Sequence, residues 1–386
     1  MTYSPVCKQS ISITGVILAG GLARRMGGKN KAFLKILDKA LIQYILKNLK
    51  VSLDEILINA NQNLKKFDQL GFPVITDRLD GFAGPLAGIA AGLQAATSSH
   101  ILVVPCDSPF ITDDLVSRFV TAYSQTNADI CVAHDGQRLQ PVFALINIKT
   151  LPSLLTYLDA GNHKIDTWYK QQQMTTVDFS DVPETFININ TPEELRNAEM
   201  QMVLKNINTP LLGFAAHSGS GKTTLLTKLI PALKAKSLRI GLVKHAHHGF
   251  EIDHPGKDSY ELRKAGATQV IVGSQLRWAH IVETPTSEEK PSLAKLINHF
   301  DHDSLDLILV EGFKLENIPK IEVFRPSLKK ERLSIDHADF IAVATDEPLA
   351  GLTPSDQQMT ILDLNNIDEI ARFILAQIDM KNNYEQ

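Results

Sequence analysis

The sequence contains little cysteine and no long apolar run. Its three cysteines, Cys7, Cys106 and Cys131, are too few and too scattered for a disulfide framework or a cysteine-rich zinc site, which is typical of a reducing compartment. No stretch approaches the roughly 18 apolar residues that span a bilayer, and the start, MTYSPVCKQSISITG, lacks the pattern of a signal peptide. We therefore expect a cytoplasmic protein without a membrane partner.

An excess of positive charge is also missing. The 39 Lys and Arg residues face 43 Asp and Glu residues, and the net charge of -4 argues against a general nucleic-acid binder, so we expect no nucleic-acid partner. A local basic cluster can still hold a phosphate. Apolar residues make up 44% of the 386 positions, and this length predicts two or three globular domains.

Short apolar runs alternate with helix-period stretches, a pattern that predicts α/β domains with mainly parallel sheets. The strands expected in the first half are Ile13–Leu18, Glu55–Ala60, Pro73–Thr76, Ile101–Pro105, Ala128–Ala133 and Pro141–Ile146. The helices expected there are Ala40–Leu49, Pro85–Ala96, Thr112–Tyr123, Leu151–Leu158 and one from Thr191 to about Leu204.

The second half repeats this alternation. Its expected strands are Leu211–Ala215, Arg239–Val243, Gln269–Val272, Leu305–Val310, Lys320–Phe324 and Phe340–Ala344, and its expected helices are Lys222–Lys234 and Asp258–Ala265. Between the halves, residues 205–209 and the following Pro210 break the pattern. We therefore expect a first domain at 1–204, a linker at 205–209 and a second domain at 210–386.

A glycine-rich basic loop, residues 19–31, follows the first expected strand. Its glycines let the backbone approach a ligand, and its N–H groups can face an anion. The bases in and after this loop are Arg24, Arg25, Lys29, Lys31 and Lys35, with no acid among them. A triphosphate fits such a loop, although a flexible, solvated basic turn has the same composition.

Polar residues end three of the expected strands of the first half. Asn59, Asp77 and Asp107 stand at these ends, and ligands of open α/β sheets bind outside the carboxyl ends of strands. Asp107 can thus carry Mg2+ beside a nucleotide whose phosphates supply the other oxygen ligands. The alternative for Asp107 is a simple turn before Pro109.

These motifs together resemble the molybdenum cofactor guanylyltransferase (MobA) family over about residues 11–203. The resemblance rests on Leu18-Ala-Gly-Gly, Arg25-Met-Gly, Lys31, Asn59-Ala-Asn, Gly84-Pro-Leu-Ala-Gly and Pro105-Cys-Asp-Ser-Pro. It implies a GT-A-like, Rossmann-like nucleotidyltransferase fold. It also implies transfer of GMP from GTP to Mo-molybdopterin, with release of pyrophosphate and formation of the guanine dinucleotide cofactor.

The resemblance also implies site residues. Those expected to bind GTP are Leu18, Ala19, Gly20, Gly21, Lys31, Asn59, Asp77 and Asp107. Asp107 would bind the Mg2+ of GTP, and Lys31 with Arg25 would neutralise charge on the leaving pyrophosphate. Asn188 and Asn190 resemble the segment near the pterin substrate, although Asn190-Thr-Pro also describes a turn into a capped helix.

A Walker A P-loop, Ala216-His-Ser-Gly-Ser-Gly-Lys-Thr-Thr, follows the first strand of the second half. The residues expected to bind the nucleotide are Gly219, Ser220, Gly221, Lys222, Thr223 and Thr224. Glycines let the loop N–H groups wrap a phosphate, Lys222 reaches the β/γ oxygens, and Thr223 offers a hydroxyl to Mg2+. Glu311 ends a buried strand and can hold the same metal, whereas Asp306 stands at the start of that strand, away from the site.

The histidine-rich run Lys244-His-Ala-His-His has His254 nearby. It allows a zinc interpretation, but no cysteine or paired carboxylate stands at ligand spacing, so contact with a phosphate or a partner is favoured.

Residues 209–375 resemble the MobB family of GTP-binding proteins from molybdopterin guanine dinucleotide biosynthesis. The shared motifs are Gly219-Ser-Gly-Lys-Thr-Thr, Val243-Lys-His-Ala-His-His, the run from Pro255 to Gly266 and Leu309-Val-Glu-Gly-Phe-Lys. The resemblance implies GTP binding with weak hydrolysis at most, and homo-oligomers through this domain. It also implies partnership with a molybdopterin-insertion protein and with apo-molybdoenzymes or their chaperones.

Two alternatives stay open at this point. One is a sugar-phosphate or CTP-dependent nucleotidyltransferase fused to a small-molecule kinase. In the other, the second half is purely a scaffold that docks the enzymes receiving the cofactor, and its P-loop is a nucleotide-occupancy switch. Gly21 and the segment around Asn188 favour the guanylyltransferase.

Overall fold

The structure is a computed structural model. It describes residues 11–20, 22–23, 29–77, 84–246, 249–284, 292–335, 337–349 and 359–384. The chain divides into two compact units, Met1–Ala198 (unit 1) and Glu199–Gln386 (unit 2). This division falls inside helix α7 (Pro192–Leu204), shortly before the expected linker.

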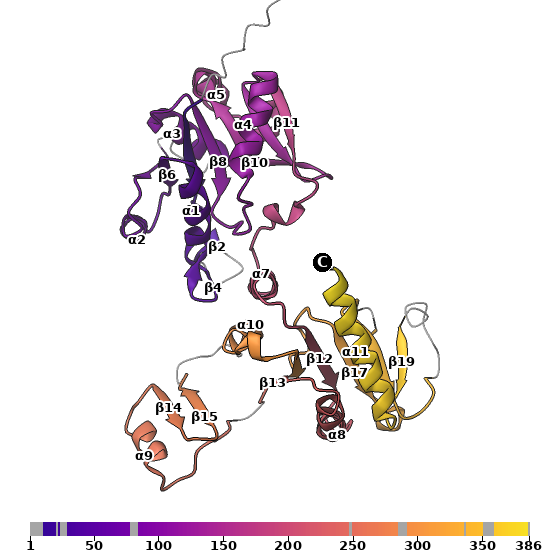
Figure 1. The fold of residues 1–386 in the computed structure, drawn as a ribbon. Coiled ribbons are helices and arrows are strands. Elements are labelled where there is room, and N and C mark those ends of the chain that lie inside the picture. Colours follow the sequence, from indigo (N-terminus) through magenta and orange to yellow (C-terminus); the bar gives the residue numbers. More distant parts are fainter. Residues whose placement is uncertain are drawn as a thin grey trace, which may run out of the picture. The chain divides into compact units, whose positions relative to one another are not determined.

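The described part of unit 1 is built on a seven-stranded sheet (Figure 1). The strands, in spatial order, are β11 (Met174–Asp178), β9 (Ile130–His134), β10 (Leu139–Asn147), β8 (His100–Pro105), β1 (Ile13–Leu18), β6 (Glu55–Asn59) and β7 (Val74–Ile75). Strand β10 runs antiparallel to both of its neighbours, and the other pairs are parallel. The sheet is therefore mainly parallel, as the sequence predicts.

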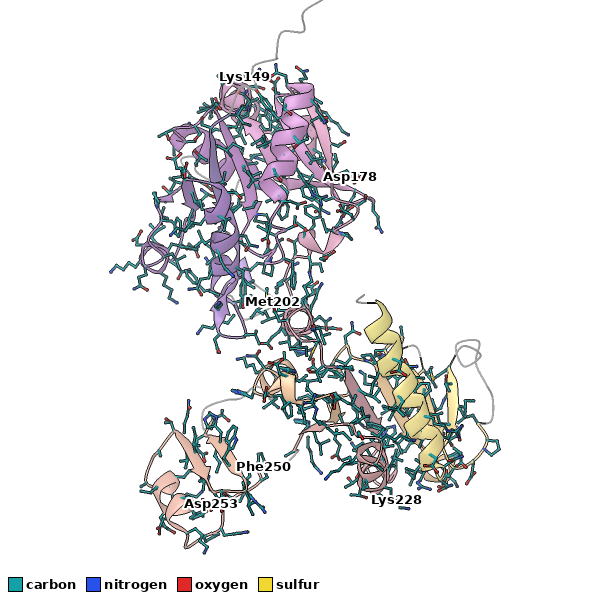
Figure 2. All side chains as sticks on the ribbon, in the orientation of Figure 1. Lys149, Asp178, Met202, Lys228, Phe250 and Asp253 are labelled. Atoms are coloured by element: carbon teal, nitrogen blue, oxygen red, sulfur yellow. The ribbon has the colours of Figure 1, made fainter. Side chains whose placement is uncertain are left out.

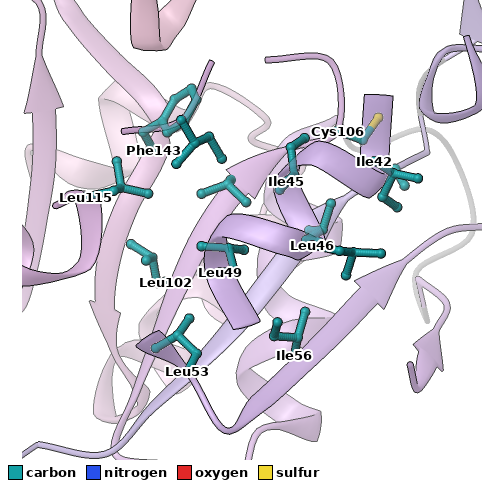
Figure 3. Packing of buried hydrophobic residues seen from close by; sticks show 14 of the residues in the cluster. Ile42, Ile45, Leu46, Leu49, Leu53, Ile56, Leu102, Cys106, Leu115 and Phe143 are labelled. Carbon is teal, nitrogen blue, oxygen red and sulfur yellow. The ribbon is translucent and has the colours of Figure 1, made fainter. Parts of the chain in front are cut away.

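Helices cover both faces of this sheet because its central strands are apolar on both sides. The helices are α1 (Leu41–Ser52), α2 (Leu64–Asp68), α3 (Pro85–Ala95), α4 (Leu115–Thr126), α5 (Leu151–Asp159) and α6 (Ile165–Tyr169). Leu102 packs in the core that contains Ile45 and Leu49 of α1 (Figure 3), whereas its neighbour Val103 packs in the opposite core with Leu86 of α3. This alternation follows the two-residue period of a strand.

Short elements lie between β1 and α1. They are the hairpins β2 (Leu22–Ala23) with β3 (Lys29–Asn30) and β4 (Lys35–Ile36) with β5 (Lys39–Ala40), and the 3-10 turn η2 (Lys31–Phe33). They place Lys31 at the end of the basic loop.

The described part of unit 2 contains a six-stranded parallel sheet. Its order is β13 (Ile240–Lys244), β16 (Leu307–Glu311), β12 (Leu211–Ala216), β17 (Lys320–Phe324), β18 (Phe340–Thr345) and β19 (Thr360–Asp363). Helices α8 (Lys222–Lys234) and α11 (Ile367–Tyr384) share one core with these strands, and α10 (Leu293–Ile297) is a further short helix. Strand β19 and helix α11 are absent from the sequence prediction.

Residues 249–284 of unit 2 form a small separate element. Strands β14 (Gln269–Gly273) and β15 (Trp278–Val282) pair antiparallel, and α9 (Asp258–Lys264) precedes them. The expected strand at Gln269–Val272 therefore exists but does not join the parallel sheet. Its apolar side chains are largely exposed. No helix among the described residues is long and apolar enough to span a membrane.

Candidate functional site

The first site lies at the carboxyl edge of the unit 1 sheet, where β1, β6, β7 and β8 end. Because these strands are parallel, their ends meet at one edge. The Ala19 N–H donates to the Asn59 carbonyl over 2.8 Å, and the Cys106 N–H donates to the Leu18 carbonyl over 3.0 Å. These bonds extend the pairing of β1 with β6 and β8 past Leu18. They therefore fix the point at which the predicted residues Leu18, Ala19 and Gly20 leave the sheet.

Asn59 and Asp77 are brought together as the sequence predicts. The Asn59 amide Nδ2 donates to Asp77 Oδ1 over 2.8 Å. Helix α3 lies so close that a Cβ on Gly88 would stand 2.4 Å from the Asn59 amide oxygen, so any other residue there would displace the Asn59 side chain.

Asn61 is a further member of this group that the sequence prediction did not assign. Its Nδ2 donates to Asp77 Oδ2 over 2.7 Å, and its Oδ1 accepts the Asp77 N–H over 2.9 Å. It belongs to the Asn59-Ala-Asn motif, and that motif was the available signal.

Lys31 and Asp107 form an ion pair. The Lys31 ammonium lies 2.8 Å from Asp107 Oδ2, and the two side chains are 17% and 15% exposed. Asn30 caps the turn that carries the lysine, because its Oδ1 accepts the Ala32 N–H over 2.9 Å. The end of β8 thus positions Asp107, and the end of the basic loop positions Lys31.

The predicted pterin segment reaches the same place. Lys31 Nζ also donates to Asn190 Oδ1, Ser108 Oγ donates to Asn188 Oδ1 over 2.7 Å, and the Ile189 N–H donates to the Asp107 carbonyl over 3.0 Å. All the predicted unit 1 residues that the structure describes therefore border one sheet edge.

A capping box at α7 fixes this segment. The Glu194 carboxylate accepts the N–H groups of Asn190 and Thr191 over 2.7 and 2.9 Å, and the Thr191 hydroxyl accepts the Glu194 N–H over 3.1 Å. The turn and the capped helix thus exist alongside the contact to Lys31, so the two interpretations of Asn190 do not exclude each other.

Two predicted residues, Gly21 and Arg25, lie outside the described residues. Cys106 is buried beside Asp107, and burial first, then the Asp107 charge, raises the pKa of its thiol. It is therefore not suited to act as a nucleophile.

The second site surrounds the P-loop between β12 and α8. Gly219 and Gly221 both have φ +85°, which only glycine adopts without strain. Ser220 is buried, and its N–H and Oγ both donate to the His217 carbonyl, over 3.3 and 2.8 Å. The loop therefore closes as a tight turn, with Lys222, Thr223 and Thr224 in the first turn of α8.

Glu311 joins the side chains around this loop. Its Oε1 accepts from the Thr223 hydroxyl over 3.4 Å and lies 3.8 Å from Lys222 Nζ. Its Oε2 lies 3.4 Å from Lys244 Nζ, a residue that the prediction did not assign to the nucleotide site. Burial lowers the pKa of Lys222, Glu311 acts in the opposite direction, and the ammonium groups of Lys314 and Lys244 lower it further.

Asp306 lies away from the P-loop, as the sequence predicts. It precedes β16 and binds Arg239 with an Nη2–Oδ1 distance of 2.8 Å, and hydrogen bonds from Arg239 lower its pKa to about 2.

The histidine run contributes no metal cluster within the described residues. No three His, Cys, Asp or Glu side chains gather as metal ligands in the ranges that the structure describes. His247 and His248 lie outside these ranges.

The fold and the two sites define a class of protein, a nucleotidyltransferase domain followed by a P-loop domain. Residues 15–176 match the family described as MobA-like NTP transferase domain, and residues 211–346 match the family described as molybdopterin guanine dinucleotide synthesis protein B.

Curated relatives make the assignment more specific. Molybdenum cofactor guanylyltransferases of Shewanella woodyi and Shewanella frigidimarina are 43% and 42% identical, over 48% and 49% of this chain and 94% and 97% of those proteins. The chain belongs to the molybdenum cofactor guanylyltransferase family, and its second half carries a MobB domain. It is thus a nucleotidyltransferase.

Solved structures match each half. Molybdopterin-guanine dinucleotide biosynthesis protein A from Archaeoglobus fulgidus is 22% identical, with 50% of this chain and 99% of that chain covered and a TM-score of 0.43. A MobB protein homolog from Bacillus stearothermophilus is 24% identical, with 44% of this chain and 98% of that chain covered and a TM-score of 0.32.

Proposed function

We propose that unit 1 transfers GMP from GTP to Mo-molybdopterin, releasing pyrophosphate and forming molybdopterin guanine dinucleotide. The observation that carries this proposal is the position of Lys31, whose ammonium contacts both Asp107 and Asn190. One side chain thereby joins the predicted nucleotide site to the predicted pterin segment. This arrangement supports a transferase that brings two phosphate-bearing substrates together.

The donor set around Asp107 fits Mg2+. This ion binds to proteins through one or two carboxylates and takes its remaining ligands from substrate phosphates and water. Asp107 supplies one carboxylate, and no larger cluster is needed. When bound, Mg2+ would neutralise charge on the GTP phosphates.

The reaction we propose is an in-line attack of the terminal pterin phosphate oxygen on the α-phosphorus of GTP. The new P–O bond forms as the bond from the α-phosphorus to the bridging oxygen of pyrophosphate breaks. Lys31, with Arg25, neutralises charge on the leaving group, and Asn59 and Asp77 hold the nucleoside. The ionised phosphate nucleophile needs no general base.

For unit 2 we propose a GTP-binding adaptor with weak hydrolysis at most. Thr223 and Glu311 fit Mg2+ because a hydroxyl and a carboxylate oxygen lie next to the phosphate-binding Lys222. The proposed partners are a molybdopterin-insertion protein and apo-molybdoenzymes or their chaperones. Joining both domains in one chain raises their effective concentration for each other.

We also propose that residues 249–284 mediate homo-oligomers. The exposed fractions of Ile271, Leu276 and Trp278 are 69%, 88% and 71%. Phe250, labelled in Figure 2, is 70% exposed. A two-stranded sheet with so many exposed apolar side chains is marginally stable alone, and a second copy would cover them.

The experiment incubates the full chain with molybdate-loaded molybdopterin, Mg2+ and GTP, or CTP, or ATP, and determines the mass of the product. We expect the guanine dinucleotide with GTP and little product with the other nucleotides. Preferential product from CTP would contradict the guanylyl assignment and favour the alternative transferase.

A further inference from the structure

An arginine outside both recognised motifs lies against the P-loop. Arg325 follows β17, which stands between β12 and β18 in the sheet. Its Nε donates to the Ser220 carbonyl over 3.0 Å, and its Nη1 forms an ion pair with Asp346, which follows β18. Arg325 therefore joins the P-loop to the end of a strand two positions away.

The guanidinium also packs against the last glycine of the loop. A Cβ on Gly221 would stand 3.3 Å from Arg325 Nη2 and 3.6 Å from Nε. The positive φ of Gly221 favours glycine there, and the guanidinium would have to shift slightly to admit a Cβ. The arginine thus touches both residues of the peptide unit that links Ser220 to Gly221.

The contact with Arg325 also fixes the direction of the Gly221 N–H, because the peptide unit is planar and trans. In a trans peptide unit the C=O and the following N–H point in opposite directions. Holding the Ser220 carbonyl toward Arg325 therefore turns the Gly221 N–H to the other side of the loop. P-loops bind phosphate with such N–H groups.

We infer that Arg325 is a positioning residue that orients the Gly221 N–H toward the phosphates of a bound nucleotide, and that Asp346 holds Arg325 for this purpose. The inference rests on the proposed nucleotide binding by unit 2. The ligand class is a nucleoside di- or triphosphate. Because the loop amides hold the phosphates that GDP and GTP share, loss of Arg325 weakens both ligands by the same factor.

The test measures GTP and GDP affinities of the full chain. The nucleotide binding that is lost in the Lys222→Ala variant is attributed to unit 2. Arg325→Gln is compared with Asp346→Asn, with the double variant and with Arg239→Gln. The last variant removes another Arg–Asp pair, Arg239 with Asp306, which stands where β13 and β16 begin, away from the P-loop.

We expect Arg325→Gln to weaken GTP and GDP binding by about ten-fold or more, since charge-assisted hydrogen bonds are among the stronger ones. The ratio of the two affinities stays constant, the double variant binds no more weakly than Arg325→Gln, and Arg239→Gln binds like the wild type. A role in stability alone would change the melting temperature and leave the affinities unchanged.

Wild-type affinities for both nucleotides in a folded Arg325→Gln chain would overturn the inference. If that variant does not fold, Asp346→Asn decides, because it keeps the arginine: a smaller, equal loss for both nucleotides supports the inference, and unchanged affinities overturn it. Absence of any Lys222-dependent binding in the wild type would instead refute the proposed function of unit 2.

Discussion

The two units hold the lysines of their proposed phosphate sites differently. In unit 1, Lys31 lies 2.8 Å from Asp107 and also contacts Asn190. In unit 2, Lys222 lies 3.8 Å from Glu311, and Lys244 and Thr223 share that carboxylate. Lys31 thus contacts the predicted pterin segment, whereas Lys222 lies in the first turn of α8, next to the P-loop.

The two sites also differ in how the chain builds them. The P-loop site comes mainly from one segment, residues 216–224, with Glu311 added from the neighbouring strand. The unit 1 site takes residues from four strand ends, from η2 at the end of the basic loop, and from the segment just before α7. A contiguous loop suits the binding of one ligand, and a dispersed site suits the approach of two substrates.

The largest expected effect comes from Asp107→Ala. The variant loses the proposed metal ligand and the partner of Lys31, so guanylyl transfer falls by on the order of 1,000-fold. The rate of pyrophosphate release with GTP, Mg2+ and molybdopterin measures it. Asp114→Ala, which removes a surface ion pair with Arg118, is the control and keeps its rate. A near-wild-type rate for Asp107→Ala would refute the metal assignment.

Lys222→Ala tests whether the sites are separate. We expect unit 2 to lose about 100-fold in GTP affinity, because the ammonium that reaches the phosphates is gone. Guanylyl transfer by unit 1 continues in the same chain. Equilibrium binding and product mass, measured on one preparation, check both statements. Loss of transfer together with binding would show that the sites depend on each other.

The third prediction concerns the stability of unit 1 in acid. Burial first, then the charge of Lys149, lowers the pKa of His100 to about 4. In the unfolded chain the His100 imidazole takes up a proton below about pH 6.5, whereas in the folded unit it stays neutral down to about pH 4. The contribution of neutral His100 to the free energy of unfolding is therefore complete above about pH 6.5. It falls by about 3 kcal/mol as the pH drops to 4.

Urea unfolding of unit 1 at pH 7 and pH 4.5 measures this dependence. His100→Gln should reduce the difference between the two pH values, and the exposed His163→Gln should keep it. An unchanged difference in His100→Gln would assign the acid sensitivity to other groups.

The smallest effect is expected for Asn61→Ala. Asp77 loses two hydrogen bonds, at 2.7 and 2.9 Å, and its carboxylate keeps only the bond from the Asn59 amide. We expect the KM for GTP to rise about five-fold to ten-fold, with little change in kcat. The neighbouring Gln62→Ala is the control. A fall in kcat at constant KM would place Asn61 in the chemical step instead.

Much of the fold could be predicted from apolar runs. The strand at Lys320–Phe324 and the helix at Lys222–Lys234 have the predicted bounds. Strand β11 was not predicted, because its sequence, MTTVD, is only weakly apolar and its pairing with β9 defines it. Helix α11 was readable from the i, i+4 spacing of Ile370, Ile374 and Ile378, and the prediction left it out.

The two sites also differ in how far the sequence alone could predict them. The P-loop could be predicted because its chemistry lies in consecutive residues. The contact of Lys31 with Asn190 joins residues 159 positions apart, and that of Arg325 with Ser220 joins residues 105 positions apart. Local patterns do not encode such contacts, so only the fold could bring Arg325 to the P-loop. Resemblance to a family supplied Asn190 but no role for Arg325.

The number of GTP molecules bound per chain shows whether each unit holds its own nucleotide. Native mass spectrometry with Mg2+-GTP and no molybdopterin can count them for the wild type, Lys222→Ala and Asp77→Ala. We expect two nucleotides on the wild type and one on each variant. A single nucleotide on the wild type, or two on Lys222→Ala, would contradict this expectation.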